Sequence, residues 1–420
     1  MASPSPSLGA LWRVFGRIGL LSFGGPAAQI ALMHRELVED RPWLTEDQFL
    51  RALSFCMMLP GPEAMQLATY AGWRLRGVPG GLLGGALFVL PGAAVIAALS
   101  LLYARFGTLP LVAALFVGIK ATVVVIVLEA LLRVSRKALK STDRWAIAGL
   151  SFVGIFFLHL PFPAIILAAG TYGFLSTRAR PPDDATALPR GHLRRTIAVW
   201  GGLWLLPVAA LWLADAAFLT DLALFFSKLA VVTFGGAYAV LAYMTQAVVA
   251  EHGWISTQQM IDGLGLAETT PGPLILVTQF VGMLAGDLRG GVGLALASGA
   301  VVLWVTFVPC FLWIFAGAPY IDWLAHQPRL SGALSAITAA VVGVILNLSV
   351  WFALHVLFGQ VTEVRFGPVT LLRPDWASFD TPAAALGLIA ALCLLRLHWP
   401  LPRVLAVSAG LGLALGLAGI

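Results

Sequence analysis

Long apolar stretches separated by short polar loops make up most of this chain. Stretches of the length that crosses a lipid bilayer, about 20 residues, recur from one end to the other. In chain order they lie near residues 11–33, 53–73, 81–103, 109–132, 145–177, 196–214, 222–245, 259–285, 291–316, 331–357, 381–396 and 402–420. The stretch 145–177 is interrupted by Pro161 and Pro163 and is long enough for a pair of short helices, which brings the total to 13 segments. This pattern predicts an all-α, polytopic helical bundle in a lipid bilayer.

The composition excludes a soluble protein. Of the 420 residues, 59% are apolar without counting the 44 glycines, and only 11% are charged, against about 25% in soluble domains. The net charge of +6 comes mostly from short basic clusters between apolar stretches, which orient helices and do not indicate nucleic-acid binding. The sequence has no phosphate-binding glycine loop, no nucleophile elbow and no metal-ligand spacing. We therefore expect neither an enzyme nor a cofactor or a metal.

The sequence contains an internal repeat. Shifting it by 211 residues superimposes residues 15–62 on 226–273, with 14 identities in 48 pairs. Two glycine and proline motifs coincide: Phe23-Gly24-Gly25 with Phe234-Gly235-Gly236, and Pro60-Gly61-Pro62 with Pro271-Gly272-Pro273. We call them the FGG and PGP motifs. Scattered matches between apolar segments would not keep these motifs in register, so the chain is predicted to consist of two homologous halves.

The basic residues predict that the two halves have opposite orientations. Basic clusters at 133–144 and 178–195 flank the pair of short helices, and both clusters are expected in the cytoplasm. The N-terminus is then cytoplasmic and the C-terminus lies on the other side. The predicted division is a first repeat over 1–178, a linker with a connecting transmembrane helix over 179–221, and a second repeat over 222–420. Inverted repeats give two equivalent states, one open to each side, so this arrangement favours a transporter.

The FGG and PGP motifs fall inside segments that otherwise have the pattern of continuous helices. Glycine and proline weaken or interrupt a helix, so each motif predicts a break or a re-entrant turn at membrane depth. Such a break is tolerated only where it is buried in protein or lines a cavity, and the new helix start exposes N–H groups that attract an anion. Single kinks or close-packing glycines would give the same residues, but four paired breaks favour a substrate region.

Five ionisable residues lie within or beside these segments. Arg17 and Lys228 occupy equivalent positions six residues before the FGG motifs, where either cation would complement an anion or would extend to the membrane surface. Glu63 follows Pro62, Glu268 precedes Pro271 by three residues, and Lys120 lies inside the segment 109–132. Because a charge in the membrane is costly, we treat Glu63, Glu268 and Lys120 as candidates for coupling to protons.

At these residues the sequence resembles the chromate ion transporter family. The resemblance rests on Phe23-Gly24-Gly25-Pro26, the loop 39–44, Leu59-Pro60-Gly61-Pro62 and their second-half counterparts, and it covers almost the whole chain in the long, two-domain form. It implies proton-driven chromate efflux across the bacterial inner membrane, which confers chromate resistance.

The residues alone therefore predict a transporter for an anion, and chromate is implied only by the resemblance. Sulfate has the same shape and charge as chromate and is the main alternative substrate. An anion channel and a structural membrane protein are the alternative classes. The expected partners are the oxyanion, protons and the lipid bilayer, and any homodimer contact would lie within the membrane.

Overall fold

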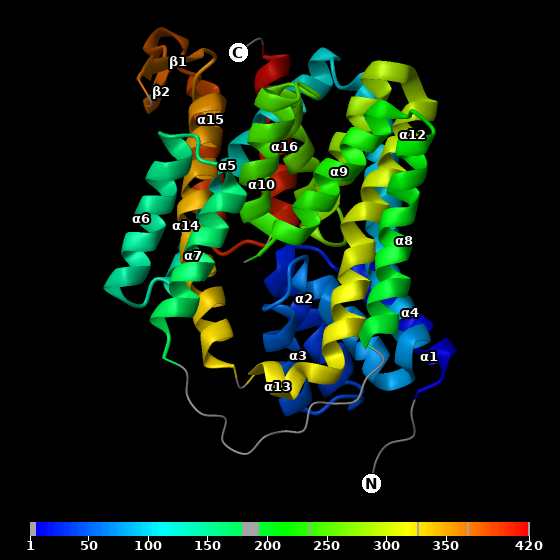
Figure 1. The fold of residues 1–420 in the computed structure, drawn as a ribbon. Helices are drawn as coiled ribbons and strands as arrows, with labels where there is room; N and C mark the ends of the chain where they lie inside the picture. The colour runs from blue at the N-terminus through cyan, green and yellow to red at the C-terminus, as the bar shows by residue number, and fades with distance from the viewer. Residues whose placement is uncertain (1–5, 179–192, 235–236, 326, 368, 419–420) are drawn as a thin grey trace. The chain divides into compact units, whose positions relative to one another are not determined.

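The computed structural model describes residues 6–178, 193–234, 237–325, 327–367 and 369–418. These residues are mostly helical (Figure 1), which confirms the predicted all-α class. They form two compact units, and each unit takes segments from both halves of the sequence. The first unit is drawn from residues 1–101, 178–237 and 270–331, and the second from 102–177, 238–269 and 332–420.

The first unit contains helices from both sequence halves. Its first-half elements are α1 (Leu8–Leu21), α2 (Gly25–His34), the π-helical turn η1 (Arg35–Glu39), α3 (Glu46–Cys56) and most of α4 (Glu63–Phe106). The others are α8 (Leu193–Leu213), α9 (Ala217–Val232), η3 (Leu274–Leu276), α12 (Val277–Gly317), η4 (Ala318–Tyr320) and α13 (Ile321–Ala325). Helix α12 packs against α8 and α9.

The second unit contains the remaining helices and a small β-hairpin. Its helical elements are α5 (Pro110–Ala138), α6 (Thr142–Phe156), α7 (Phe162–Ser176), α10 (Ala237–Gln246), η2 (Ala247–Glu251), α11 (Thr257–Thr269), α14 (Pro328–Leu357), η5 (Trp376–Ser378), α15 (Thr381–Ala391), η6 (Leu392–Arg396) and α16 (Leu401–Leu417). Strands β1 (Val361–Phe366) and β2 (Val369–Pro374) pair antiparallel, with Val361 opposite Pro374. The hairpin lies between the apolar stretches predicted at 331–357 and 381–396. Helix α5 packs against α11, α15 and α16.

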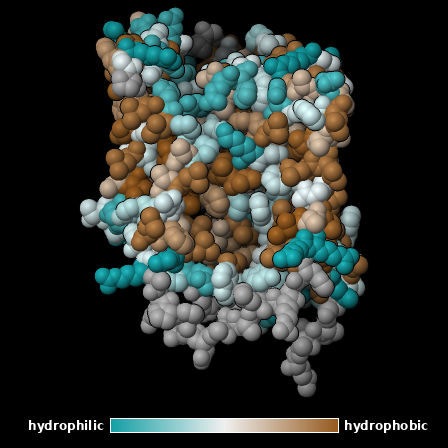
Figure 2. Space-filling model, in the orientation of Figure 1, coloured by the Kyte–Doolittle hydropathy of each residue, from teal (hydrophilic) through white to brown (hydrophobic). Residues whose placement is uncertain are grey.

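Apolar surface identifies the chain as a multi-pass membrane protein. Among the described residues, five helical stretches are long and apolar enough to cross a bilayer: 63–106, 110–138, 193–213, 274–320 and 328–357. Many of their large apolar side chains are exposed, and Figure 2 shows apolar side chains over much of the visible face. So much exposed apolar surface is stable only against lipid. The remaining apolar helices have 10–17 residues, which is shorter than the hydrocarbon core of about 30 Å requires.

Helices α4 and α12 are each a helical hairpin. Their backbone leaves the helical region at Arg76–Gly77 and at Gly290–Gly291. Gly77 has a φ of 61° and Gly291 a φ of 69°. After the turn in α4 the chain runs back along itself, because Gly80 lies against the carbonyl of Gly72 and Gly84 against that of Ala68. The stretch from Glu63 to this turn is about 20 Å long and does not cross a bilayer.

Close glycine contacts join the long helices of the second unit to shorter neighbours. A Cβ at Gly118 of α5 would lie 1.8 Å from the Ser408 carbonyl of α16, and one at Gly412 would lie 2.6 Å from the Ala114 carbonyl. A Cβ at Gly173 of α7 would lie 2.3 Å from the Gly332 carbonyl of α14. Since no side chain fits between these backbones, the helices approach each other more closely than larger residues would allow.

Equivalent local structures recur in the two halves. Thr45 and Gln48 form a capping box at the start of α3, and Ser256 and Gln259 exchange the same two hydrogen bonds at the start of α11. The loops between α6 and α7 and before α16 share the pattern His-x-Pro-x-Pro, and the two histidines, His159 and His398, have φ values of 50° and 52°. These details support the predicted duplication, while the opposite orientation of the halves stays a prediction.

Replacing Gly118 by Ala is expected to destabilise the protein, because the new Cβ would overlap the Ser408 carbonyl. Overpacking of this kind costs about 1–3 kcal/mol. The thermal midpoint in detergent, followed by size-exclusion chromatography of heated samples, measures the loss. Gly410→Ala on α16 is the matched control, since no atom lies within 4 Å of a Cβ there. Equal midpoints for the two variants would contradict the close packing of α5 on α16.

Candidate functional site

The first-half motifs interrupt the helices where the sequence predicts. Helix α1 ends at Leu21 and α2 begins at Gly25, with Gly24 in the left-handed conformation and Pro26 in the first turn. Helix α3 ends at Cys56, and α4 begins at Glu63 directly after the first-half PGP motif. The first N–H groups of a helix have no partner within that helix, and this is the feature that attracts anions.

The second-half motifs also separate helices. Helix α9 ends at Val232, and Thr233 and Phe234 are non-helical. Gly235 and Gly236, the predicted binding glycines of this motif, lie outside the described residues. Helix α11 ends at Thr269, and Pro273 precedes the short helix η3, which leads into α12.

The motifs of the two halves are joined crosswise by backbone hydrogen bonds within the first unit. The Gly272 N–H of the second-half PGP motif donates to the Ser22 carbonyl at the first-half break, at 2.9 Å. The Gly61 N–H of the first-half PGP motif donates to the Thr233 carbonyl at the second-half break, at 2.8 Å. Gly61 and Gly272 are 211 residues apart, and so are Ser22 and Thr233. The two bonds are therefore equivalent, and each links one half to the other.

Each PGP motif also packs on the hairpin helix of the opposite half. Gly272 and Pro271 lie against Gly92 of α4, where a Cβ would be 2.2 Å from the Pro271 carbonyl. Gly61 lies against Cys310 of α12, since its own Cβ would be 2.9 Å from the Cys310 sulfur. A proline precedes each contact residue, Pro91 before Gly92 and Pro309 before Cys310. Only a small side chain fits between each PGP motif and its neighbouring helix.

Two glutamine amides hold the breaks in place. Gln29 of α2 is buried, and its Nε2 donates to the Gly272 carbonyl at 2.7 Å and to the Ser22 carbonyl at 3.3 Å. Gln66 of α4 donates through Nε2 to the Pro60 carbonyl at 2.7 Å. The sequence analysis missed Gln29, although a polar residue one turn into a broken membrane helix is itself a signal.

The four breaks differ in accessibility. Phe23 is 36% exposed, and Gly24, Gly25 and Pro26 are half-buried. Pro60 and Pro62 are also half-buried, whereas Pro271, Gly272 and Pro273 are buried. The first-half breaks therefore have partly exposed residues, whereas the second-half PGP motif has none.

The two predicted cations lie on exposed faces of their helices. Arg17 has a 59% exposed side chain, and its Nη1 lies 3.3 Å from Oε1 of Glu36, a buried carboxylate that also pairs with Arg41. Lys228 is exposed on α9 at the equivalent position. Arg17 thus already has a carboxylate partner, but the group of Arg17, Glu36 and Arg41 retains one net positive charge.

The three predicted proton-coupling residues lie in different surroundings. Glu63 is half-buried at the first turn of α4, where the helix dipole favours a carboxylate. Glu268 of α11 is buried in the second unit, and Oε1 accepts a hydrogen bond from Tyr238 at 2.8 Å. Lys120 of α5, also in the second unit, lies 3.9 Å from Oδ1 of Asp262. The sequence analysis missed Tyr238 and Asp262 because their partners are distant along the chain.

The fold and the joined breaks define a multi-pass helical membrane protein with discontinuous helices, an architecture common among transporters. The chain belongs to the chromate transporter family, whose model matches residues 9–174 and 220–414. It is 30% identical to the probable chromate transport protein of Synechococcus elongatus, over 96% of this chain and 94% of that protein. It is 29% identical to the chromate transport protein of Cupriavidus metallidurans, over 92% and 94% of the two chains. The Pseudomonas aeruginosa chromate transport protein is 31% identical, over 88% and 85%. No solved structure was found to match.

Replacing Gln29 by Leu is expected to lower stability, because it leaves two buried carbonyl groups without their side-chain donor. Loss of the donor to the Gly272 carbonyl costs about 1–3 kcal/mol, whereas the Ser22 carbonyl keeps the Gly272 N–H. Thermal denaturation in detergent measures the change, with Gln360→Leu at an exposed position before β1 as the control. A Gln29→Leu midpoint equal to that of the control would show that the amide does not hold the breaks.

Proposed function

We propose that this protein is a secondary active transporter that exports chromate across the bacterial inner membrane, coupled to protons, and thereby confers chromate resistance. The carrying observation is the crosswise joining of the four breaks, in which each half supplies the hydrogen-bond partner of the other half's PGP motif. A site built this way changes when one half moves against the other, which is what alternating access requires. Chromate as the substrate is supported by the names of the relatives.

The proposed substrate site lies around the accessible first-half breaks. Its residues are Arg17, Phe23, Gly24, Gly25, Pro60, Gly61 and Pro62, with Lys228, Phe234, Gly235, Gly236, Pro271, Gly272 and Pro273 as second-half counterparts. The starts of α2 and α4 would donate N–H groups to the oxyanion. The net positive charge around Arg17 would attract a dianion. The basic clusters at 133–144 and 178–195 support an N-terminus in the cytoplasm and a C-terminus in the periplasm.

Electrostatics supports export as the direction of transport. Moving one charge across 100 mV is worth about 2.3 kcal/mol. An inside-negative membrane potential therefore drives a dianion outwards by about 4.6 kcal/mol per 100 mV. Proton coupling, through Glu63, Glu268 or Lys120, would add to this driving force.

Chromate flux in proteoliposomes tests the function. We expect saturable chromate uptake that follows an imposed pH gradient and persists with an equal concentration of sulfate. Elimination by sulfate would reassign the substrate to another oxyanion. Unsaturable flux without coupling would indicate an anion channel, and the absence of flux for any oxyanion would indicate a structural protein.

Variants of the proposed substrate site test where the anion binds. Arg17→Ala is expected to reduce chromate uptake about tenfold to a hundredfold, because a hydrogen bond to a charged group is worth about 1.5–3 kcal/mol. The combined change of Pro60 and Pro62 to Ala is expected to abolish uptake by extending α4 through the break. Arg365→Ala, in exposed strand β1, is the matched control for loss of an arginine. Normal uptake by these variants at wild-type expression would refute the anion site.

A further inference from the structure

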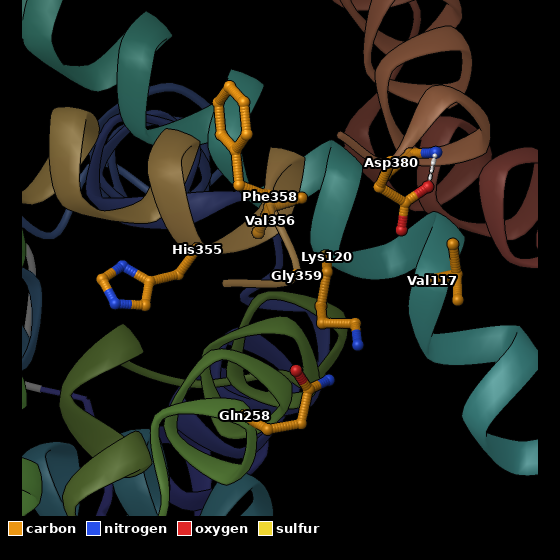
Figure 3. A pocket seen from close by; sticks show the side chains of 9 residues that line it. Val117, Lys120, Gln258, His355, Val356, Phe358, Gly359 and Asp380 are labelled. Carbon is orange, nitrogen blue, oxygen red and sulfur yellow. Dashed lines mark hydrogen bonds between the residues drawn. The ribbon is translucent and has the colours of Figure 1, made fainter. Parts of the chain in front are cut away.

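The second unit contains a cavity with charged groups on its wall. The cavity has a volume of about 190 Å³ and is lined by residues of α5, α11, α14 and the start of α15 (Figure 3). Its polar lining residues are Lys120, Gln258, His355 and Asp380. In Figure 3 the Lys120 side chain extends towards the Gln258 amide.

A buried carboxylate lies behind Lys120. Asp262 of α11 is only 4% exposed. The Tyr103 hydroxyl, near the end of α4, donates to its Oδ2 at 2.7 Å, and the Gln258 amide donates to its Oδ1 at 3.4 Å. The Lys120 Nζ lies 3.9 Å from the same Oδ1. Asp262 is thus held by groups from three helices.

Lys120 is attracted to two carboxylates. Besides Asp262, Asp380 offers a second carboxylate, because it lines the same cavity as Lys120. Asp380 caps α15, since its Oδ1 accepts the Ala383 N–H at 2.8 Å. His355, the other titratable group of the lining, is held by a contact of 2.8 Å between its Nδ1 and the Trp351 carbonyl. The long Lys120 side chain is therefore the mobile member of a group whose other members are fixed.

The charged groups in the lining and the neighbouring Asp262 together disfavour the substrate anion. With His355 neutral, two carboxylates and one ammonium give the group a net negative charge, which repels a dianion. A group of this charge attracts a cation, and a proton is the cation that the proposed function requires. When Asp262 binds a proton, it loses its attraction for Lys120, and Asp380 becomes the stronger partner.

We propose that Asp262 is the proton-binding group of this transporter and that its protonation transfers Lys120 from Asp262 to Asp380. The inference rests on the proposed function and names the group through which the proton acts. In one state the ion pair ties α5 to α11, and in the other it ties α5 to α15. These are two discrete arrangements of the kind that a conformational switch requires.

The chain itself connects this switch to the helix breaks. Asp262 lies two turns before the end of α11 at Thr269, and Thr270 leads directly into the second-half PGP motif. Release of α11 from α5 would alter the position of Gly272, whose N–H bonds to Ser22 at the first-half break. Protonation in the second unit would thus reach the anion site through continuous backbone.

Two transport assays, accumulation against a pH difference and exchange at equal pH, distinguish proton coupling from movement of the anion. Proteoliposomes with the membrane potential clamped are assayed for chromate accumulation against a pH difference and for chromate exchange at equal pH. One pH unit supports about tenfold accumulation per coupled proton, because it corresponds to about 1.4 kcal/mol. Asp262→Asn is expected to reduce the accumulation ratio to one while exchange continues. Glu251→Gln, an exposed carboxylate at the end of η2, is the control and keeps both modes.

A second variant covers the case in which Asp262→Asn fails to fold with an unpaired Lys120. The double variant Lys120→Met with Asp262→Asn removes both charges of the buried pair, and it is also expected to exchange without accumulating. Accumulation at the wild-type ratio in either variant overturns the proposal and leaves chromate transport intact. Loss of accumulation in Glu268→Gln, with accumulation kept in Asp262→Asn, would assign the proton to Glu268.

A direct measurement of the bound proton distinguishes a failure of the Asp262 proposal from a failure of the proposed transport function. Infrared difference spectra between alkaline and acidic samples are expected to show a protonated carboxyl band in the wild type that is missing in Asp262→Asn. The same band in both proteins overturns the proposal, whatever the substrate is. Wild-type vesicles that show no chromate flux in either mode would refute the proposed function, and the infrared result would still decide whether Asp262 binds a proton.

Discussion

Two backbone hydrogen bonds, from Gly272 to Ser22 and from Gly61 to Thr233, are the constraint on which the rest of this structure depends. A broken helix in a membrane leaves N–H and C=O groups that lipid cannot satisfy, and each such group costs several kcal/mol. Here the groups freed in one half are satisfied by those freed in the other. Small residues bring the broken ends together, namely Gly92, Gly272 and Cys310. The hairpin turns of α4 and α12 serve the same purpose.

The two halves follow the same plan but present unequal surfaces. The first-half breaks are half-buried, whereas the second-half PGP motif is covered by Gly92 and secured by Gln29. Gln29 has a valine, Val240, at the equivalent position of the other half. Likewise Glu63 corresponds to Leu274. Shared backbone structure thus supports both halves, while polar side chains distinguish them.

The helix breaks could be predicted from the glycine and proline residues at each break. The contacts between distant parts of the chain could not be predicted from these residues. Gly24, Pro60 and Pro62 carry their conformational preference in the residue type, so the ends of α1 and α3 could be placed from the sequence. The pairing of Gly272 with Ser22 joins residues 250 positions apart, and no local preference encodes it. Asp262 was missed because Tyr103 and Lys120 reach it from other helices.

Counting every apolar segment as a crossing would put three crossings between Gln258 and Asp380, yet both line one cavity. Hydropathy does not distinguish a short helix that turns back from one that crosses, so the number of crossings stays a prediction.

The crosswise bonds can form only late in synthesis, once segments of both halves of the chain have been made. Ser22 and Gly61 leave the ribosome long before their partners, which lie 250 and 172 residues further along the chain. At about 5–20 residues per second, the delay is roughly ten to fifty seconds. For that time the first half is in the bilayer with open helix ends that only water, lipid headgroups or the insertion machinery can satisfy. The nascent protein is therefore most vulnerable to misfolding and proteolysis when its first half is already complete.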